Sequence, residues 1–234
     1  MGNYYLIGCG GIGGWLASAL VKTLKKADVL FLMDGDKLEE KNIDRQLFSP
    51  EFIGCYKTDA MKIALEKGAR CHIESLPEFL GTNELFELKL AKECWVMMGV
   101  DNQAARVKAL AMCDKVGVNC ISASNGYEEA EAFIYKPEWI GTALDPRVYY
   151  PEILTDKSAD PLKPPCTGEI LDTTPQLAIA NMSAAAYAMW LLWYWREKYH
   201  LITDEQAQGF APVHVTSSAG RVQYISVNNK KGIT

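Results

Sequence analysis

The sequence of 234 residues has little positive charge in any one place. Its formal net charge is −5, and its longest basic runs are the lysine pairs Lys25-Lys26 and Lys230-Lys231. A nucleic-acid-binding protein needs a basic face that neutralises phosphates, so the acidic balance argues against nucleic acid as a partner. Apolar residues make up 49% and charged residues 23%, which excludes collagen-like, low-complexity and wholly disordered chains.

The sequence also lacks paired cysteines. Its seven cysteines are scattered, no Cys-x-x-Cys pair occurs, and the chain opens without a signal peptide. This pattern predicts reduced thiols in a cytoplasmic protein without a disulfide framework. Because structural zinc needs four ligands, we expect no zinc site.

A stretch without charged residues, 173–195, is long enough to span a bilayer. It contains Pro175, Asn181, many alanines and no sustained run of Leu, Ile or Val. We therefore expect a helix buried in the core or at a subunit interface, and no contact with a membrane. The apolar face of this helix favours a homodimer.

Strand-like and helix-like segments alternate through the first half of the chain. Continuous apolar runs predict strands at 4–7, 29–33, 71–76, 95–100 and 118–124. The spacing of apolar residues and the capping residues predict helices near 15–24, 58–68, 83–92 and 103–115. Such alternation is typical of a parallel sheet covered on both faces. The predicted fold class is α/β, with a Rossmann-like, mainly parallel sheet.

The pattern changes in the second half of the chain. After a strand at 132–135, the segment 137–166 carries six prolines and little periodicity, which predicts a long irregular loop. The uncharged helix follows and is expected to end near Tyr199. The segments 213–217 and 222–227 then predict an antiparallel hairpin that closes the sheet.

A glycine-rich turn lies between the first strand and the first helix. Gly8, Gly10 and Gly13 have the Gly-x-Gly-x-x-Gly spacing that lets a backbone approach a bound phosphate at a helix N-terminus. Asp34 ends the second strand 21 residues after Gly13, where a carboxylate accepts hydrogen bonds from ribose hydroxyls. The pattern predicts nucleotide binding and leaves NAD, S-adenosylmethionine and ATP open.

Charged residues gather after the second strand, where ligands bind in open α/β sheets. Arg45 offers a planar set of donors and Lys57 a mobile point charge, which suit a triphosphate better than a hydride-transfer site. A solvated charged loop would also explain either charge taken alone. Asp101 follows an apolar strand and opens a helix, so it fits an N-cap and a metal ligand equally well.

Five motifs together resemble the ThiF/MoeB family, whose members are related to the ubiquitin-activating enzymes. The motifs are Gly8-Cys-Gly10-Gly11-Ile-Gly13, Asp34-x-Asp36, Asn42-Ile-Asp-Arg45-Gln46, Gly54-x-x-Lys57 and Val100-Asp101-Asn102-x-x-x-Arg106. They match the family in order and spacing over about residues 4–125. The compact chain without zinc ligands is similar to members from plasmid, phage and other mobile-element operons, including the PRTRC-system type.

The resemblance implies an ATP-dependent adenylyltransferase. In this family the C-terminal glycine carboxylate of a small ubiquitin-like protein attacks the α-phosphate of ATP and forms an acyl-adenylate. The nucleotide-binding residues that the resemblance implies are Gly8, Gly10, Gly11, Gly13, Asp34, Asp36, Asn42, Arg45, Gln46, Lys57, Asp101 and Asn102. Among them, Arg45, Lys57 and Asp101 are the implied catalytic residues, and Asp101 is the implied ligand of Mg²⁺.

Cys166 is a further catalytic candidate, because in many relatives a cysteine on a crossing loop takes the activated acyl group. It lies between the long loop and the uncharged helix, and a thiolate near a helix N-terminus has a lowered pKa. No histidine is near in the sequence to activate it, so the onward acceptor stays open. The other six cysteines are expected to be buried apolar residues.

The chain is expected to form a single adenylation domain over 1–234, because no linker divides it. A nucleotide-binding half covers 1–125, and the half at 126–234 holds the loop, the buried helix and the hairpin. Two other functions stay open, namely a Rossmann enzyme that uses NAD or S-adenosylmethionine and a non-catalytic ThiF-like scaffold. As in some relatives, the adenylated substrate can also be a peptide.

Overall fold

The computed structural model describes residues 2–82, 94–100, 102–155, 177–203, 211–218 and 221–227. Three sequence-based predictions lie outside these residues, namely the helix at 83–92 and the roles of Asp101 and Cys166.

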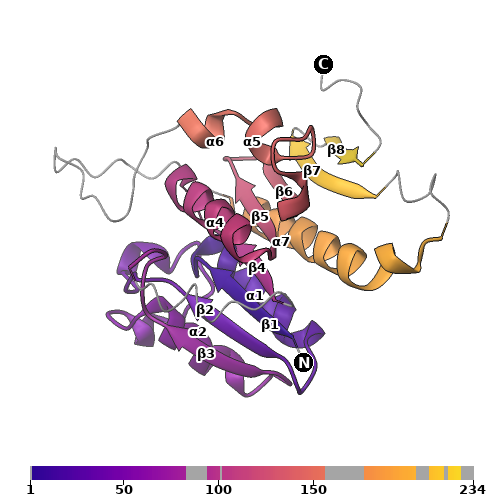
Figure 1. The fold of residues 1–234 in the computed structure, drawn as a ribbon. Helices are drawn as coiled ribbons and strands as arrows, with labels where there is room; N and C mark the ends of the chain where they lie inside the picture. Colours follow the sequence, from indigo (N-terminus) through magenta and orange to yellow (C-terminus); the bar gives the residue numbers. More distant parts are fainter. Residues whose placement is uncertain are drawn as a thin grey trace.

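Within the described residues, eight strands form one sheet in the order β3-β2-β1-β4-β5-β6-β7-β8 (Figure 1). The strands are β1 (Asn3–Ile7), β2 (Val29–Met33), β3 (His72–Leu76), β4 (Trp95–Met98), β5 (Asn119–Asn125), β6 (Ala130–Tyr135), β7 (Pro212–Ser218) and β8 (Arg221–Ser226). Neighbouring strands from β3 to β5 are parallel, and those from β5 to β8 are antiparallel. This arrangement confirms the predicted Rossmann-like sheet with late antiparallel strands.

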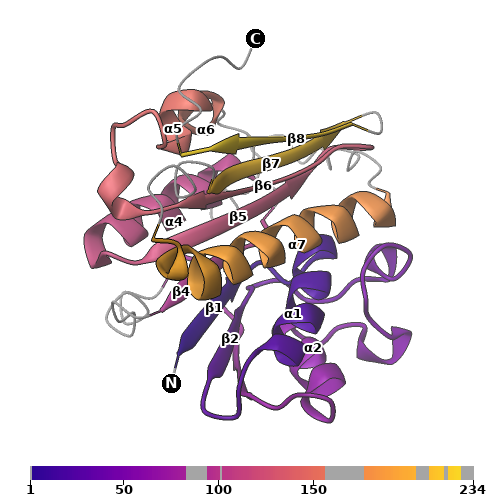
Figure 2. The ribbon, with the colours of Figure 1, turned by 90° about the vertical axis from the view of Figure 1, so that its right-hand side faces the viewer.

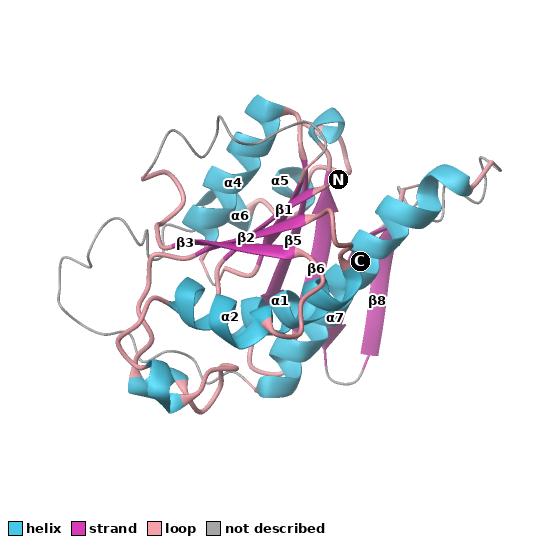
Figure 3. Cartoon of the chain, turned by 90° about the horizontal axis from the view of Figure 1, so that it is seen from below, coloured by secondary structure: helices cyan, strands magenta, loops and turns pink. Residues whose placement is uncertain are grey.

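Helices cover both faces of the sheet. They are α1 (Gly11–Thr23), α2 (Lys57–Glu66), α4 (Gln103–Val116), α5 (Pro146–Tyr149), α6 (Glu152–Thr155) and α7 (Ala178–Trp193). Figures 2 and 3 show α1, α2 and α7 on one face, with α4 on the other. The chain runs from β1 outward to β2 and β3, then returns to place β4 on the other side of β1. Ligands bind at such a reversal of strand order in open α/β sheets.

The uncharged segment forms α7, which packs against α1, β5 and β6. Ala184, Ala188 and Leu191 are fully buried there, and the small alanine side chains let the helix lie close to the sheet. The helix continues through η4 (Tyr194–Lys198) and η5 (Tyr199–Leu201). The prediction of a buried helix that ends near Tyr199 is confirmed. In the part of the chain that the structure describes, no helix has the length and apolar character needed to cross a membrane.

Two predictions about local structure were wrong. The first part of the expected irregular loop, 137–155, contains the short helices η3 (Pro137–Trp139), α5 and α6. Proline begins η3 and α5, and Asp145 caps α5 by accepting a hydrogen bond from the Arg147 N–H at 3.0 Å. In addition, Cys55 is exposed although a buried thiol was expected. Its carbonyl accepts the Leu38 N–H in a surface turn, which leaves the thiol on the outside.

Candidate functional site

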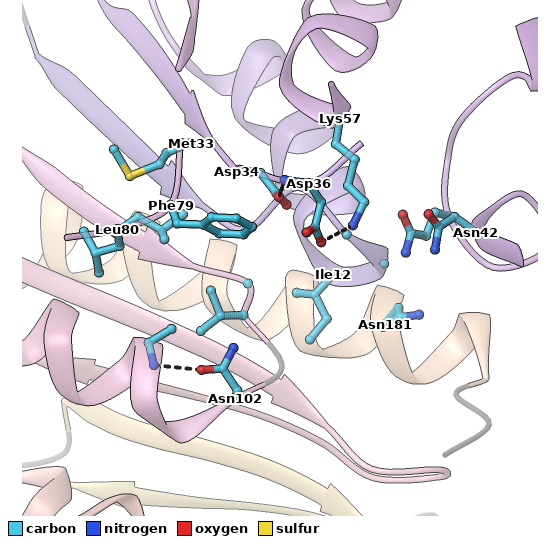
Figure 4. A pocket seen from close by; sticks show the side chains of 18 of the residues that line it. Ile12, Met33, Asp34, Asp36, Asn42, Lys57, Phe79, Leu80, Asn102 and Asn181 are labelled. Atoms are coloured by element: carbon cyan, nitrogen blue, oxygen red, sulfur yellow. Dashed lines mark hydrogen bonds and ion pairs between the residues drawn. The ribbon is translucent and has the colours of Figure 1, made fainter. Parts of the chain in front are cut away.

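A cavity of about 570 Å³ lies at the carboxyl ends of the central strands, where the strand order reverses. All the predicted nucleotide-binding residues that the structure describes line it, with the exception of Gly13. They are Gly8, Gly10, Gly11, Asp34, Asp36, Asn42, Arg45, Gln46, Lys57 and Asn102. Residues that are scattered in the sequence therefore meet at one site (Figure 4).

The glycine turn brings β1, β4 and α1 closer together than side chains would allow. Gly8 has a φ of 90°, a conformation that favours glycine. A Cβ at Gly13 would lie 2.0 Å from the carbonyl oxygen of Gly8, and a Cβ at Gly99 would lie 3.0 Å from the Gly13 nitrogen. Gly13 thus does not line the cavity, and its missing side chain lets α1 pack against the Gly8 carbonyl. The N-terminus of α1 opens into the cavity as a result.

Backbone hydrogen bonds fix the carboxylate of Asp34 at the end of β2. Its Oδ2 accepts the Cys9 N–H at 2.7 Å and its Oδ1 accepts the Asp36 N–H at 2.8 Å. Burial raises the pKa of the Asp34 carboxyl, and attraction by the Lys57 ammonium offsets this only in part. Each oxygen accepts one N–H and keeps capacity for a second donor, which a ligand hydroxyl can supply.

The segment from Asp36 to Lys57 is closed at its base by backbone pairing. The Leu38 N–H donates to the Cys55 carbonyl at 2.8 Å, and the Lys57 N–H donates to the Asp36 carbonyl at 3.0 Å. Within the segment, Asn42 Oδ1 accepts the Glu39 N–H at 3.0 Å. These bonds hold the loop that carries the predicted polar residues over the cavity.

Lys57 is the first residue of α2, and only 7% of it is exposed. Its Nζ is 2.7 Å from Oδ2 of Asp36, whose side chain is half exposed. A buried ammonium is stable when an acidic group faces it. Asp36 therefore stabilises the charged form of Lys57 at the cavity wall, where the ammonium can also contact a more negative ligand.

The other end of the cavity is apolar. The ring of Phe79 packs on Gly35, where a Cβ would come within 2.5 Å of a ring carbon. Met33 and Leu80 lie beside Phe79 (Figure 4). None of these three residues was expected at the site from the sequence. Met33 was expected only as the end of a strand, and the turn after β3 that carries Phe79 and Leu80 has no periodicity. A flat aromatic and aliphatic wall of this kind suits a purine base.

Polar residues that the sequence did not predict for the site also reach the cavity from distant elements. Lys108 comes from α4, Asn125 from the end of β5 and Asn181 from α7. The only sequence feature that could have indicated Asn181 was a polar amide within the mainly apolar segment 173–195. Lys108 and Asn125 had no distinguishing feature in the sequence.

The turn between β4 and α4 is held by two side chains. Asn102 caps α4, because its Oδ1 accepts the Ala105 N–H at 2.8 Å. The buried guanidinium of Arg106 donates to the Val100 carbonyl at 2.7 Å and to Gln103 Oε1 at 2.9 Å. Arg106 therefore fixes this turn from the interior and does not line the cavity.

Charges of both signs line the cavity. The cationic residues are Lys41, Arg45, Lys57 and Lys108, and the acidic residues are Asp34, Asp36, Glu39 and Glu78. In the described ranges, no three His, Cys, Asp or Glu side chains are arranged to hold a metal ion. The predicted Mg²⁺ ligand, Asp101, falls in a gap between those ranges.

Comparison with solved structures shows the same fold in proteins of low sequence identity. PaaA has a TM-score of 0.69 and 16% identity, and the match covers 97% of this chain and 64% of PaaA. MccB of E. coli, solved with ATP, has a TM-score of 0.65 and 17% identity, with 96% of this chain and 63% of MccB covered. A complex of MccB with AMPCPP and MccA matches equally well. The chain thus spans less than two thirds of the length of these neighbours.

Comparison of the sequence with protein families gives a direct assignment. No curated protein matches the chain. The model of the ThiF family matches residues 2–138, which contain the glycine turn, the segment from Asp36 to Lys57 and the turn before α4. Because this match covers more than half of the chain, the protein belongs to the ThiF family.

Proposed function

We propose that the protein is an ATP-dependent adenylyltransferase that activates the C-terminal glycine of a small ubiquitin-like protein as an acyl-adenylate. One observation carries this proposal: the apolar side chains of Phe79 and Leu80, the fixed carboxylate of Asp34 and the ammonium of Lys57 follow one another across a single cavity (Figure 4). Adenine, ribose and triphosphate require these three environments in that order.

Each part of ATP has a matching group in the cavity. Phe79 and Leu80 offer the apolar wall to adenine, and Asp34 accepts hydrogen bonds from the ribose hydroxyls. The N–H groups at the start of α1 and the side chains of Arg45 and Lys57 meet the phosphates. This distribution of charge favours ATP over the two alternatives, because S-adenosylmethionine carries no phosphate and NAD carries a diphosphate where ATP carries the more negative triphosphate.

The chemical step follows from this placement. An oxygen of the substrate carboxylate attacks the α-phosphorus, the bond from that phosphorus to the bridging oxygen of the β-phosphate breaks, and pyrophosphate leaves. Arg45 and Lys57 stabilise the negative charge that collects on the pyrophosphate. Carboxylate and phosphate oxygens are the ligands Mg²⁺ prefers, and Mg²⁺ held by Asp101 would neutralise part of the phosphate charge.

Two solved structures of one neighbour support the choice of nucleotide. The MccB of E. coli has been solved with ATP and also with AMPCPP and MccA. A nucleotide in the corresponding cavity of this chain is consistent with those complexes. Onward transfer to a thiol, with Cys166 as the candidate, is a separate proposal that adenylation does not require.

A homodimer is the second part of the proposal. Several large apolar side chains of α7 are exposed, namely Ile179, Met182, Trp190 and Trp193. Burying them against a second copy would remove apolar surface from water. Light scattering coupled to size exclusion measures the mass, and a monomer at micromolar concentration would contradict this part alone.

ATP–pyrophosphate exchange tests the reaction. The enzyme is mixed with small proteins that end in Gly-Gly and are encoded by neighbouring genes, and labelled pyrophosphate is followed into ATP. Exchange is expected for the wild type and for Cys166→Ala, and it should be lost in Arg45→Ala and Asp101→Ala. Binding of NAD or S-adenosylmethionine in place of ATP would contradict the proposal. ATP binding without exchange for any candidate would favour a scaffold.

A further inference from the structure

Asn181 is a buried amide without a hydrogen-bond partner among the described residues. It is 0% exposed, and neither Oδ1 nor Nδ2 makes a hydrogen bond there. Buried polar groups in proteins are nearly always paired, because an unpaired group loses its bonds to water without replacement. An unpaired amide that lines a cavity is therefore a candidate for contact with a ligand.

The position of Asn181 brings this amide to the start of α1. A Cβ on Gly11 would lie 2.6 Å from Nδ2 and 3.0 Å from Oδ1, so the amide covers the first residue of that helix. In Figure 4, Asn181 lies with Asn42 and Lys57, on the side of Ile12 that is far from Phe79 and Leu80. The amide is thus at the end of the cavity where the proposed reaction takes place.

Gln46 provides a second unpaired acceptor at the same turn. Its Oε1 is buried and has no partner among the described residues. Its Nε2 lies 3.8 Å from the position that a Cβ on Gly10 would take. Gly10, which precedes α1, and Gly11, which begins it, therefore each lie near an amide side chain that has an unpaired oxygen.

The ligand group that fits must both donate and accept. Phosphate oxygens only accept hydrogen bonds, so they can pair with Nδ2 but leave both side-chain oxygens unpaired. The donors of adenosine are expected at the opposite end, with Phe79 and Asp34. An extended polypeptide has the required pattern, because the N–H and C=O of one residue point to the same side of the strand.

We propose that Asn181 binds the penultimate residue of the substrate tail in an extended conformation. Its Nδ2 donates to the C=O of that residue and its Oδ1 accepts the N–H, while Gln46 Oε1 is available to another N–H of the tail. This inference rests on the proposed adenylation. It assigns discrimination against free amino acids and fatty acids to Asn181, because those carboxylates have no penultimate residue whose N–H and C=O could pair with the amide.

Unreactive mimics of the acyl-adenylate test the inference without knowledge of the natural partner. Three acyl sulfamoyl adenosines are compared by calorimetry with the full chain. The peptide probe carries acetyl-Gly-Gly, the ester probe carries acetyl-glycolyl-Gly and so lacks the penultimate N–H, and the short probe carries acetyl alone. The wild type should bind the peptide probe about tenfold more tightly than the ester probe, because one hydrogen bond is lost.

Variants then assign the difference to Asn181. Asn181→Ala should bind the peptide and ester probes equally, with unchanged affinity for the short probe. Asn181→Leu, which leaves no space for a replacing water, should give the same result. Met182→Ala, an exposed neighbour on the same helix, is the matched control and should keep the tenfold difference. Thermal melts of every variant establish that it is folded.

Three outcomes overturn the inference. In the first, the wild type binds the peptide and ester probes with equal affinity. In the second, Asn181→Ala still binds the peptide probe about tenfold more tightly than the ester probe. In the third, Asn181→Ala loses as much affinity for the short probe as for the peptide probe. A different outcome counts against the proposed function itself, namely that neither ATP nor any of the three probes binds.

Discussion

Gly13 and Gly14 are neighbours in α1, yet the same substitution is expected to have opposite effects at the two positions. A Cβ at Gly13 would lie 2.0 Å from the carbonyl oxygen of Gly8. That oxygen belongs to the backbone, so no side-chain rotamer relieves the contact. A Cβ at Gly14 would meet nothing closer than Cβ of Leu47 at 3.5 Å, which is ordinary van der Waals contact.

The magnitudes follow from these distances. In Gly13→Ala, β1 and α1 must separate by about 1 Å before the contact becomes tolerable, and forcing packed elements apart costs about 3 kcal/mol, the upper end of the usual range for overpacking. The total stability of a folded domain is about 5–15 kcal/mol. Gly14→Ala should stabilise the protein by up to about 1 kcal/mol, because alanine has the higher helix propensity.

Urea unfolding followed by circular dichroism measures both variants against the wild type. The urea concentration at the unfolding midpoint should fall steeply for Gly13→Ala and rise for Gly14→Ala. For Gly14→Ala the slope of the unfolding free energy against urea concentration should stay unchanged. A similar loss of stability in both variants would refute the reasoning. In that case the close contact between α1 and the Gly8 carbonyl would not be what positions the start of the helix at the cavity.

Three other side chains have roles that can be measured. Phe79→Ala should weaken ATP binding roughly tenfold in calorimetry, because an aromatic contact with the base is worth about 1–3 kcal/mol; unchanged affinity would place adenine elsewhere. Arg106→Lys should lower the free energy of unfolding by about 1–2 kcal/mol, since lysine cannot bond two groups in fixed directions; equal stability in urea would contradict this. Burial opposes ionisation of Glu131, yet hydrogen bonds from His214 and Ser124 hold its pKa below the usual range. A lowered pKa stabilises the fold above the unfolded-state pKa, so the advantage of wild type over Glu131→Gln should shrink between about pH 5 and pH 3. A constant difference over that range would show that Glu131 does not titrate with folding.

The parts of the fold that depend on local rules could be predicted from the sequence. The continuous apolar run Val29–Met33 is confirmed as a buried parallel strand, because only a strand covered on both faces can place every residue of such a run in an apolar environment. The Gly8-x-Gly10-x-x-Gly13 spacing likewise predicts a backbone turn from residues that are close together in the sequence. Both are properties of short segments.

The parts that depend on topology could not be predicted. Phe79 meets Gly35 from 44 residues away, and Asn181 meets Gly11 from 170 residues away, so neither contact leaves a local pattern. The helices α5 and α6 have four residues each, which is too short for apolar residues to repeat with helical spacing. The exposure of Cys55 follows from a loop pairing with Leu38 that composition does not reveal.

Asn181 also offers a test of why an apolar helix keeps a buried amide. If no group of the protein pairs with the amide, its removal should not weaken the fold. Asn181→Ala removes the cost of an unpaired buried group, about 1–3 kcal/mol, and alanine also has the higher helix propensity. The small cavity that the substitution leaves costs roughly 1 kcal/mol. The free energy of unfolding in urea should therefore stay equal or rise by about 1 kcal/mol. A loss of more than about 2 kcal/mol would mean that the amide stabilises the folded protein through bonds of its own, and the case for a ligand at this position would lose its basis.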